Sequence, residues 1–157
     1  MNRRCVFLPL SIAAIIGLAA CSNDEKELRL SGGVDNFVID PKYTAFCSAY
    51  DDLNIALNEM TESGTNKETF AAVLAKSKVL VDLSPDDVAD AVLSNDAILN
   101  AMNQAFAERD YDEEKIVADD GLRLEVQQLY AQDGLPEMTS KYANYLVENC
   151  GVSVNDN

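Results

Sequence analysis

The stretch YTAFCSAYDDLNIALNEM, residues 43–60, decides the fold class of the chain. Its large apolar side chains recur at alternating spacings of three and four residues, at Tyr43, Phe46, Tyr50, Leu53, Leu57 and Met60. This spacing places them along one face of an α-helix, while Asp51, Asp52 and Glu59 fall mostly on the other side. The segment therefore predicts an amphipathic helix whose apolar face packs against other helices.

Residues that end and start helices follow this segment. Ser63 and Gly64 predict the end of the first helix. Thr65, with Glu68 three residues later, predicts a capping box at the start of a second helix. The apolar positions of that second helix are Phe70, Val73, Leu74, Leu80 and Val81.

Residues 84–87, Ser-Pro-Asp-Asp, form a third start signal. Serine caps a helix, proline is tolerated in the first turn, and acids suit the positive end of the helix dipole. The helix predicted here runs to about Glu108, with apolar positions at Val88, Val92, Leu99, Met102 and Phe106. Because Asn95 falls on the face that this helix would bury, a division into two segments at residues 94–96 is the alternative.

Further apolar faces continue to residue 151. Ile116 and Val117 follow an acidic turn, and another face consists of Leu122, Val126, Leu129 and Tyr130. Gly134 and Pro136 separate it from a last helix that ends at residues 149–151. The apolar residues of this helix are Met138, Tyr142, Tyr145 and Leu146. We therefore predict an all-α domain over residues 43–151, a single helical bundle of five or six segments.

The first twenty residues have the order of a secretory signal peptide. Arg3 and Arg4 precede an uncharged, mostly apolar run over residues 6–20, and polar and charged residues begin at Ser22. The run leads into Leu18-Ala19-Ala20-Cys21, which resembles the lipobox of bacterial lipoproteins. An uncleaved membrane anchor is the alternative, since the run is only just long enough to cross a bilayer.

The resemblance to a lipobox implies cleavage before Cys21 and attachment of diacylglycerol to the Cys21 thiol. Two acyl chains are enough to anchor a protein stably to a bilayer. We therefore expect residues 1–20 to be a cleaved signal peptide, 21–42 a lipidated tether, 43–151 the helical domain and 152–157 a disordered tail. The protein is then extracytoplasmic, and the lipid bilayer is a partner through acylated Cys21.

The chain is strongly acidic, with a formal net charge of −15. Removal of residues 1–20 takes away two arginines and no acids, which leaves −17. Because this charge repels nucleic acid, we expect no nucleic-acid partner. An acidic surface that is simply solvated is the first interpretation, and attraction to a basic partner or to cations is the second.

Four cysteines are present, and two of them have predicted fates. Cys5 leaves with the signal peptide and Cys21 carries the lipid. Cys47 and Cys150 then remain in an oxidising compartment, where disulfide pairing is the usual state. A reactive or metal-binding cysteine is the alternative, but two sulfurs in a chain without histidine make a poor zinc site.

A disulfide between Cys47 and Cys150 would constrain the topology. Bridged cysteines hold their Cα atoms about 4.4–6.8 Å apart. The start of the first helix must therefore meet the end of the last one, most simply with the two helices antiparallel. This arrangement requires either the break at Asn95, which gives six helices, or one short segment that lies crosswise.

Few residues suggest reaction chemistry. The lack of histidine excludes Ser-His and Cys-His nucleophilic sites. Residues 110–114 carry acids at three EF-hand positions, but Lys115 and Gly121 occupy later positions that need glycine and glutamate. We interpret this segment as a capped helix start, with calcium binding as the alternative. We expect no catalytic residues, no metal and no cofactor, and therefore no enzyme.

Three tyrosines, Tyr43, Tyr142 and Tyr145, could line a ligand pocket near the bridged ends, although aromatic residues at helical spacing are more often core. The mature chain resembles the small, acidic, cysteine-paired helical lipoproteins of Gram-positive bacteria, through its lipobox and the residues flanking Cys47 and Cys150. That resemblance implies no activity. We expect a non-enzymatic binding or assembly module of the cell envelope, with an unknown envelope protein as partner. The alternative is a lipoprotein that binds a small molecule or cation for a membrane transporter.

Overall fold

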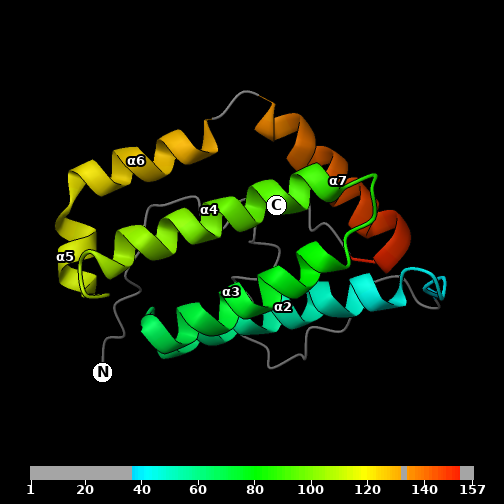
Figure 1. The fold of residues 1–157 in the computed structure, drawn as a ribbon, viewed down its shortest axis with the longest axis horizontal. Coiled ribbons are helices and arrows are strands. Elements are labelled where there is room, and N and C mark those ends of the chain that lie inside the picture. The colour runs from blue at the N-terminus through cyan, green and yellow to red at the C-terminus, as the bar shows by residue number, and fades with distance from the viewer. Residues whose placement is uncertain (1–36, 132–133, 153–157) are drawn as a thin grey trace, which may run out of the picture.

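The computed structural model describes residues 37–131 and 134–152, and six α-helices lie within them (Figure 1). They are α2 (Thr44–Ser63), α3 (Lys67–Asp82), α4 (Ala89–Ala107), α5 (Glu113–Ala118), α6 (Asp120–Tyr130) and α7 (Leu135–Cys150). The predicted all-α class and helical bundle are confirmed. The predicted signal peptide, Cys21, most of the predicted tether and residues 153–157 lie outside the described residues.

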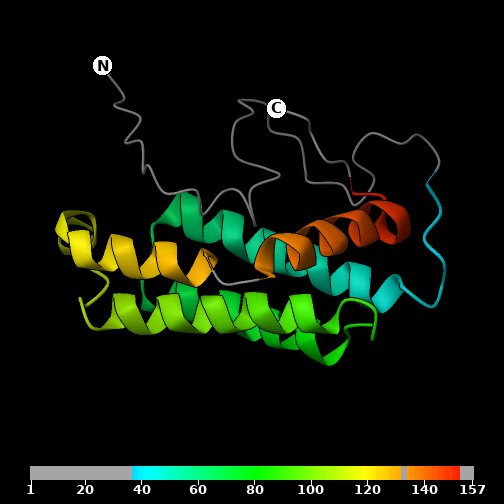
Figure 2. The same ribbon diagram turned by 90° about the horizontal axis from the view of Figure 1, so that it is seen from above.

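The helices form an up-and-down four-helix bundle in which two consecutive helices, α6 and α7, take the place of the fourth helix (Figures 1 and 2). α2 and α3 form an antiparallel hairpin, and α4 runs antiparallel to α3. α6 and α7 together run back in the direction opposite to α4. The short α5 lies across the end of the bundle between α4 and α6, so the crosswise segment is the topology observed, and α7 ends beside the start of α2.

α4 continues unbroken through Asn95, so the predicted division at residues 94–96 is wrong. The half-buried Asn95 side chain lines an internal cavity. An amide that faces open space is not enclosed by apolar atoms alone, and it carries a smaller desolvation cost than a sealed polar group. The helix therefore accommodates asparagine on its inner face.

The cap of α3 lies one residue beyond the predicted Thr65. Asn66 Oδ1 accepts hydrogen bonds from the backbone N–H groups of Glu68 at 2.9 Å and Thr69 at 3.0 Å. In return, Thr69 Oγ1 accepts a hydrogen bond from the Asn66 N–H at 3.0 Å. The reciprocal pattern of a capping box is thus present, but Asn66 and Thr69 form it, because asparagine caps helices at least as well as threonine.

The predicted start of the third helix at residues 84–87 is also displaced, since α4 begins at Ala89. The Ser84 hydroxyl donates a hydrogen bond to the Val81 carbonyl at 2.8 Å, so it satisfies the end of α3. A single turn follows, in which the Val88 N–H donates to the Pro85 carbonyl at 3.0 Å. The predicted ends at Ser63 and Cys150 are confirmed.

Three groups of buried apolar side chains form the core. The group at the disulfide end includes Phe46, Leu80, Val92, Tyr142 and Leu146. The middle group consists of Ala56, Leu57, Val73 and Leu99. The group at the α5 end includes Phe70, Met102, Phe106, Leu122 and Val126. Each large apolar side chain buried in this way stabilises the fold by about 1.5–3 kcal/mol.

The chain packs against the bundle before α2 begins. Ile39 contacts the core group at the disulfide end, and so does Val152 at the other end of the described chain. The Phe37 ring lies directly against Gly151. None of the helices in residues 37–131 and 134–152 combines the length and apolar character needed to cross a membrane.

Candidate binding cavity

A cavity of about 40 Å³ lies between the helices of the bundle. We call it the interhelical cavity, and its lining comes from α2, α3, α4, α6 and α7: Tyr50, Leu53, Asn54, Leu57, Ser77, Leu80, Val92, Asn95, Ile98, Leu99, Tyr130 and Tyr142. A cavity needs about 10–15 Å³ on this measure to hold one water molecule, so this one has room for roughly three. It is partly open to solvent.

Three phenol side chains give the interhelical cavity its polar character. Tyr142 is only 7% exposed, and its ring centroid lies 6.3 Å from that of Tyr50. Burial raises the pKa of Tyr142, and the neighbouring Tyr50 raises it further. Burial is also the main cause of the raised pKa values of Tyr50 and Tyr130. All three side chains are therefore neutral hydrogen-bonding groups at physiological pH.

Ser77 contributes a hydroxyl from α3 that is already engaged as a donor. Its Oγ donates to Asp96 Oδ1 at 2.7 Å, although Ser77 is 2% exposed. The other Asp96 oxygen accepts a hydrogen bond from Asn100 Nδ2 at 3.0 Å. Asp96, which does not line the cavity, is thus held by two donors. The Ser77 oxygen keeps acceptor capacity for a further partner.

No residue that lines the interhelical cavity carries a formal charge. Nearby on α2, Asp51 has a raised pKa, first through burial and second through the charge of Asp52. Asp52 itself forms an ion pair with Lys76 at 2.8 Å. Within the described residues, no three acidic or cysteine side chains come together as a metal site would require. The arrangement can bind and orient a molecule, and it holds no charged acid–base pair at its surface.

Only one of the three tyrosines predicted for a pocket lines the interhelical cavity. Tyr142 does, whereas Tyr43 and Tyr145 pack edge to face with ring centroids 5.7 Å apart. Sequence reasoning missed Tyr50 and Tyr130, which it assigned to apolar helix faces. Asn95 was the available signal, because an amide on an otherwise apolar face indicates a local polar space.

The predicted bridge between Cys47 and Cys150 is present. Its sulfurs join residues 103 positions apart, and both cysteines are completely buried. Around it, Phe46 meets Tyr145 edge to face at 5.8 Å and Tyr142 at 6.5 Å. The bridge and these rings fix α7 on α2, and so they position Tyr142 opposite Tyr50 in the cavity wall.

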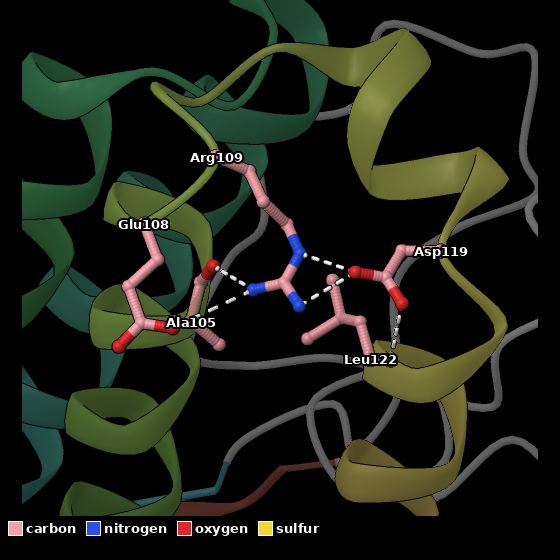
Figure 3. Close-up of polar contacts among 5 residues, drawn as sticks. All are labelled: Ala105, Glu108, Arg109, Asp119 and Leu122. Carbon is pink, nitrogen blue, oxygen red and sulfur yellow. Dashed lines mark hydrogen bonds and ion pairs between the residues drawn. The ribbon is translucent and has the colours of Figure 1, made fainter.

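A second clamp fixes α6 on the end of α4 (Figure 3). Arg109 donates from Nε and Nη2 to Asp119 Oδ2 at 2.8 Å and 2.6 Å, and from Nη1 to the Ala105 carbonyl at 2.6 Å. Asp119 Oδ1 accepts a hydrogen bond from the Leu122 N–H at 3.0 Å, which caps α6. This arrangement sets the direction of the helix that delivers Tyr130 to the cavity.

The acidic segment at residues 110–114 starts a helix, as we interpreted it. Asp112 Oδ1 accepts hydrogen bonds from the N–H groups of Glu114 at 3.0 Å and Lys115 at 3.2 Å, and it caps α5. Lys115 forms an ion pair with Asp110 at 3.0 Å. The position where an EF-hand needs glycine is therefore occupied by a cation that neutralises part of the acidic segment.

Comparisons of the chain with protein-family models, with curated proteins and with solved structures give no match.

Proposed function

We propose that the protein is an extracytoplasmic lipoprotein, anchored through acylated Cys21, that serves as a non-enzymatic binding or assembly module of the cell envelope. The observation that carries this proposal is the buried bridge between Cys47 and Cys150. Structural disulfides form in oxidising compartments and are rare in the cytosol. The bridge therefore agrees with the export that the lipobox-like residues 18–21 imply.

The binding part of the proposal is supported by the neutral lining of the interhelical cavity. General acid–base catalysis needs a titratable group near the reacting atoms, with a pKa near the working pH. The phenols of the cavity instead have pKa values raised above their ordinary range of about 10. They can hold a ligand through hydrogen bonds, and they are poorly suited to exchanging protons with one at neutral pH.

Binding of a small molecule for a membrane transporter is the second candidate, and the cavity favours it. Its lining of three tyrosines and two asparagines combines apolar surface with convergent polar groups, which is the usual composition of a ligand site. Its volume of about 40 Å³ is, however, small beside ligand pockets of about 300–1,000 Å³. An envelope protein therefore remains the first proposed partner.

Metabolic labelling with a palmitate analogue tests the anchor. We expect the natural chain and a Cys5→Ala variant to be labelled and to sediment with membranes, because Cys5 lies in the segment that we expect to be removed. Cys21→Ala should be neither labelled nor converted to a mature membrane-bound form. Equal labelling of Cys21→Ala, or loss of label in Cys5→Ala, would contradict the proposal.

Cross-linking on intact cells tests the partner. We expect a defined envelope protein to be recovered with the natural chain and to be lost from the Cys21→Ala variant, which is not held at the membrane. Recovery of the same protein with both chains would show that anchoring is not needed for the interaction. Recovery of no protein, together with a bound small molecule, would favour the second candidate.

A further inference from the structure

We infer that the interhelical cavity is a binding site for a small neutral molecule, one whose short apolar group ends in an alcohol or an amide. This inference rests on the proposed binding function and specifies a ligand class for it. The site lies between α2, α3, α4, α6 and α7, with Tyr142 in its wall. Charge, hydrogen bonding and size each limit the ligand.

The lining limits the charge of the ligand. None of the lining residues is a carboxylate, an ammonium or a guanidinium. A charged group that left water for this site would find no opposite charge, and burying an unpaired charge costs several kcal/mol or more. The Asp52 carboxylate on α2 is already paired with the Lys76 ammonium on α3. The ligand is therefore neutral.

The polar groups of the lining favour a ligand that forms hydrogen bonds. The large majority of buried polar atoms in proteins have a partner. Tyr142 is 7% exposed, and its phenol ring lies in the cavity wall. Tyr50, Asn54 and Asn95 add further donors and acceptors to the same wall. An alcohol or amide function both donates and accepts, so it satisfies such a set.

The volume limits the enclosed part of the ligand. The cavity has room for roughly three water molecules. One water molecule takes up about 30 Å³ of liquid, so the enclosed group has about the bulk of three waters. That space accepts a group of a few non-hydrogen atoms. Leu53, Leu57, Val92, Ile98 and Leu99 line the remaining wall, so the enclosed body is apolar. Because the cavity is partly open to solvent, a longer molecule can extend out of it.

Titration with shape-matched probes tests the inference. The chain from residue 21 to 157, carrying Cys21→Ser and produced with its bridge formed, is titrated with propanamide, propanoate and propylammonium. Two-dimensional amide NMR follows the cavity residues, and tyrosine fluorescence follows the phenols without interference, because the chain has no tryptophan. We expect saturable changes around the cavity with propanamide, and none there with the two charged probes.

Two phenylalanine variants form a matched pair. Tyr142→Phe removes a hydroxyl from the cavity wall, and it should weaken propanamide binding by about two- to tenfold, the range for one hydrogen bond. Tyr145→Phe removes a hydroxyl that is buried elsewhere and lacks a partner among the described residues, so it should leave the affinity unchanged. Equal effects of the two variants would overturn the assignment of Tyr142.

Each outcome supports or overturns the inference independently of the anchor. Saturation by propanoate or propylammonium at similar concentrations would contradict a neutral site. Absence of saturation by any probe would show that the cavity holds water alone. The titration uses a chain without lipid, so its failure leaves the labelling result at Cys21 untouched. Failure of the labelling experiment would likewise leave the cavity measurement intact.

Discussion

The Phe37 ring covers Gly151, the residue that ends the last helix. A Cβ atom on Gly151 would lie 2.6 Å from Phe37 Cδ1, closer than such atoms approach in proteins. Gly151 also has a φ of 67°, in the left-handed region that glycine adopts most easily. Two independent requirements therefore hold glycine at this position, and one of them ties the chain before α2 to the end of α7.

We predict that Gly151→Ala lowers the free energy of unfolding by about 2–4 kcal/mol, from the left-handed backbone together with displacement of a packed ring. Gly134→Ala is the matched control. Its φ is 81° but nothing lies within 4 Å of the added Cβ, so about 1 kcal/mol is expected. Urea denaturation measures both. Equal losses would show that Phe37 does not press on Gly151.

The buried tyrosines predict a loss of stability at high pH. Burial first, and the neighbouring Tyr43 second, raise the pKa of Tyr145 to about 12. Burial also raises the pKa of Tyr142. In the unfolded chain a phenol titrates near its ordinary pKa of about 10. The folded protein favours the neutral phenols. Their contribution to the free energy of unfolding is therefore fully present below about pH 10 and is lost as the pH rises toward the pKa in the folded protein.

Spectrophotometric titration checks this prediction, because the chain has no tryptophan to obscure tyrosinate absorbance. We expect only part of the tyrosine signal to appear reversibly near pH 10, and the remainder to appear together with loss of helix at higher pH. Tyr142→Phe should remove part of the late signal. Complete titration of all tyrosines near pH 10 with the helices intact would contradict the observed burial.

The lowered pKa of Asp119 predicts a loss of stability at low pH. Its pKa is lowered mainly by the hydrogen bond from the Leu122 N–H, and next by Arg109. The folded protein favours the charged carboxylate of Asp119. Its contribution to the free energy of unfolding is present above the pKa of about 4 in the unfolded chain, and it is lost as the pH falls through the pKa in the folded protein. Stability should therefore decline with acidification below about pH 4.

Two substitutions separate the roles of Asp119. Asp119→Asn keeps an acceptor for the cap of α6 but removes the charge that pairs with Arg109, so it should lower the melting temperature slightly and flatten the acid dependence. Asp119→Ala removes both interactions and should lower the melting temperature more. Thermal denaturation across acidic pH measures them. Identical behaviour of the two variants would mean that the cap contributes nothing.

The cap of α3 gives a direct test of a corrected prediction. Asn66→Ala should cost about 1 kcal/mol, the usual value for loss of an N-cap side chain. Thr65→Ala, the control, changes the residue that the sequence pattern indicated, and it should cost less than about 0.5 kcal/mol, as surface substitutions usually do. Chemical denaturation measures both variants. A larger loss for Thr65→Ala would restore the sequence prediction.

The helical segments and the bridge were predictable from the sequence because both depend on short-range patterns. The apolar spacing from Tyr43 to Met60 and the glycines at 64 and 151 act locally, and they set the bounds of α2 and the end of α7. Cysteine counting gave the pairing because the fates predicted for Cys5 and Cys21 left only two cysteines to pair. These signals need no knowledge of which helix faces which.

The helix starts and the cavity depended on information that lies outside any one segment. Ser84 bonds back to Val81 instead of capping forward, and both choices are open to a serine in a turn. Asp110 and Tyr111 both adopt a φ of 56°, and no glycine or other sequence signal at these positions predicts it. The interhelical cavity brings together α2, α3, α4, α6 and α7, so Tyr50 and Tyr130 become wall residues only after packing.

The bridge between Cys47 and Cys150 gives the last prediction. It closes a loop with a sequence separation of 103 residues, for which a chain-entropy estimate is about 4.7 kcal/mol. Total domain stability is typically about 5–15 kcal/mol, so the bridge supplies a large share. The double variant Cys47→Ala/Cys150→Ala should melt at a substantially lower temperature and still be largely helical when cold.

A double-mutant cycle separates the cross-link from packing. Either single substitution already breaks the bridge, so Cys47→Ala and Cys150→Ala should each lose nearly as much stability as the pair, and the losses should be far from additive. Additive losses would instead indicate two independently buried side chains. Free thiols that titrate in the folded natural chain would contradict the bridge itself. The reduced natural chain should match the variants, because it lacks the same constraint on its unfolded state.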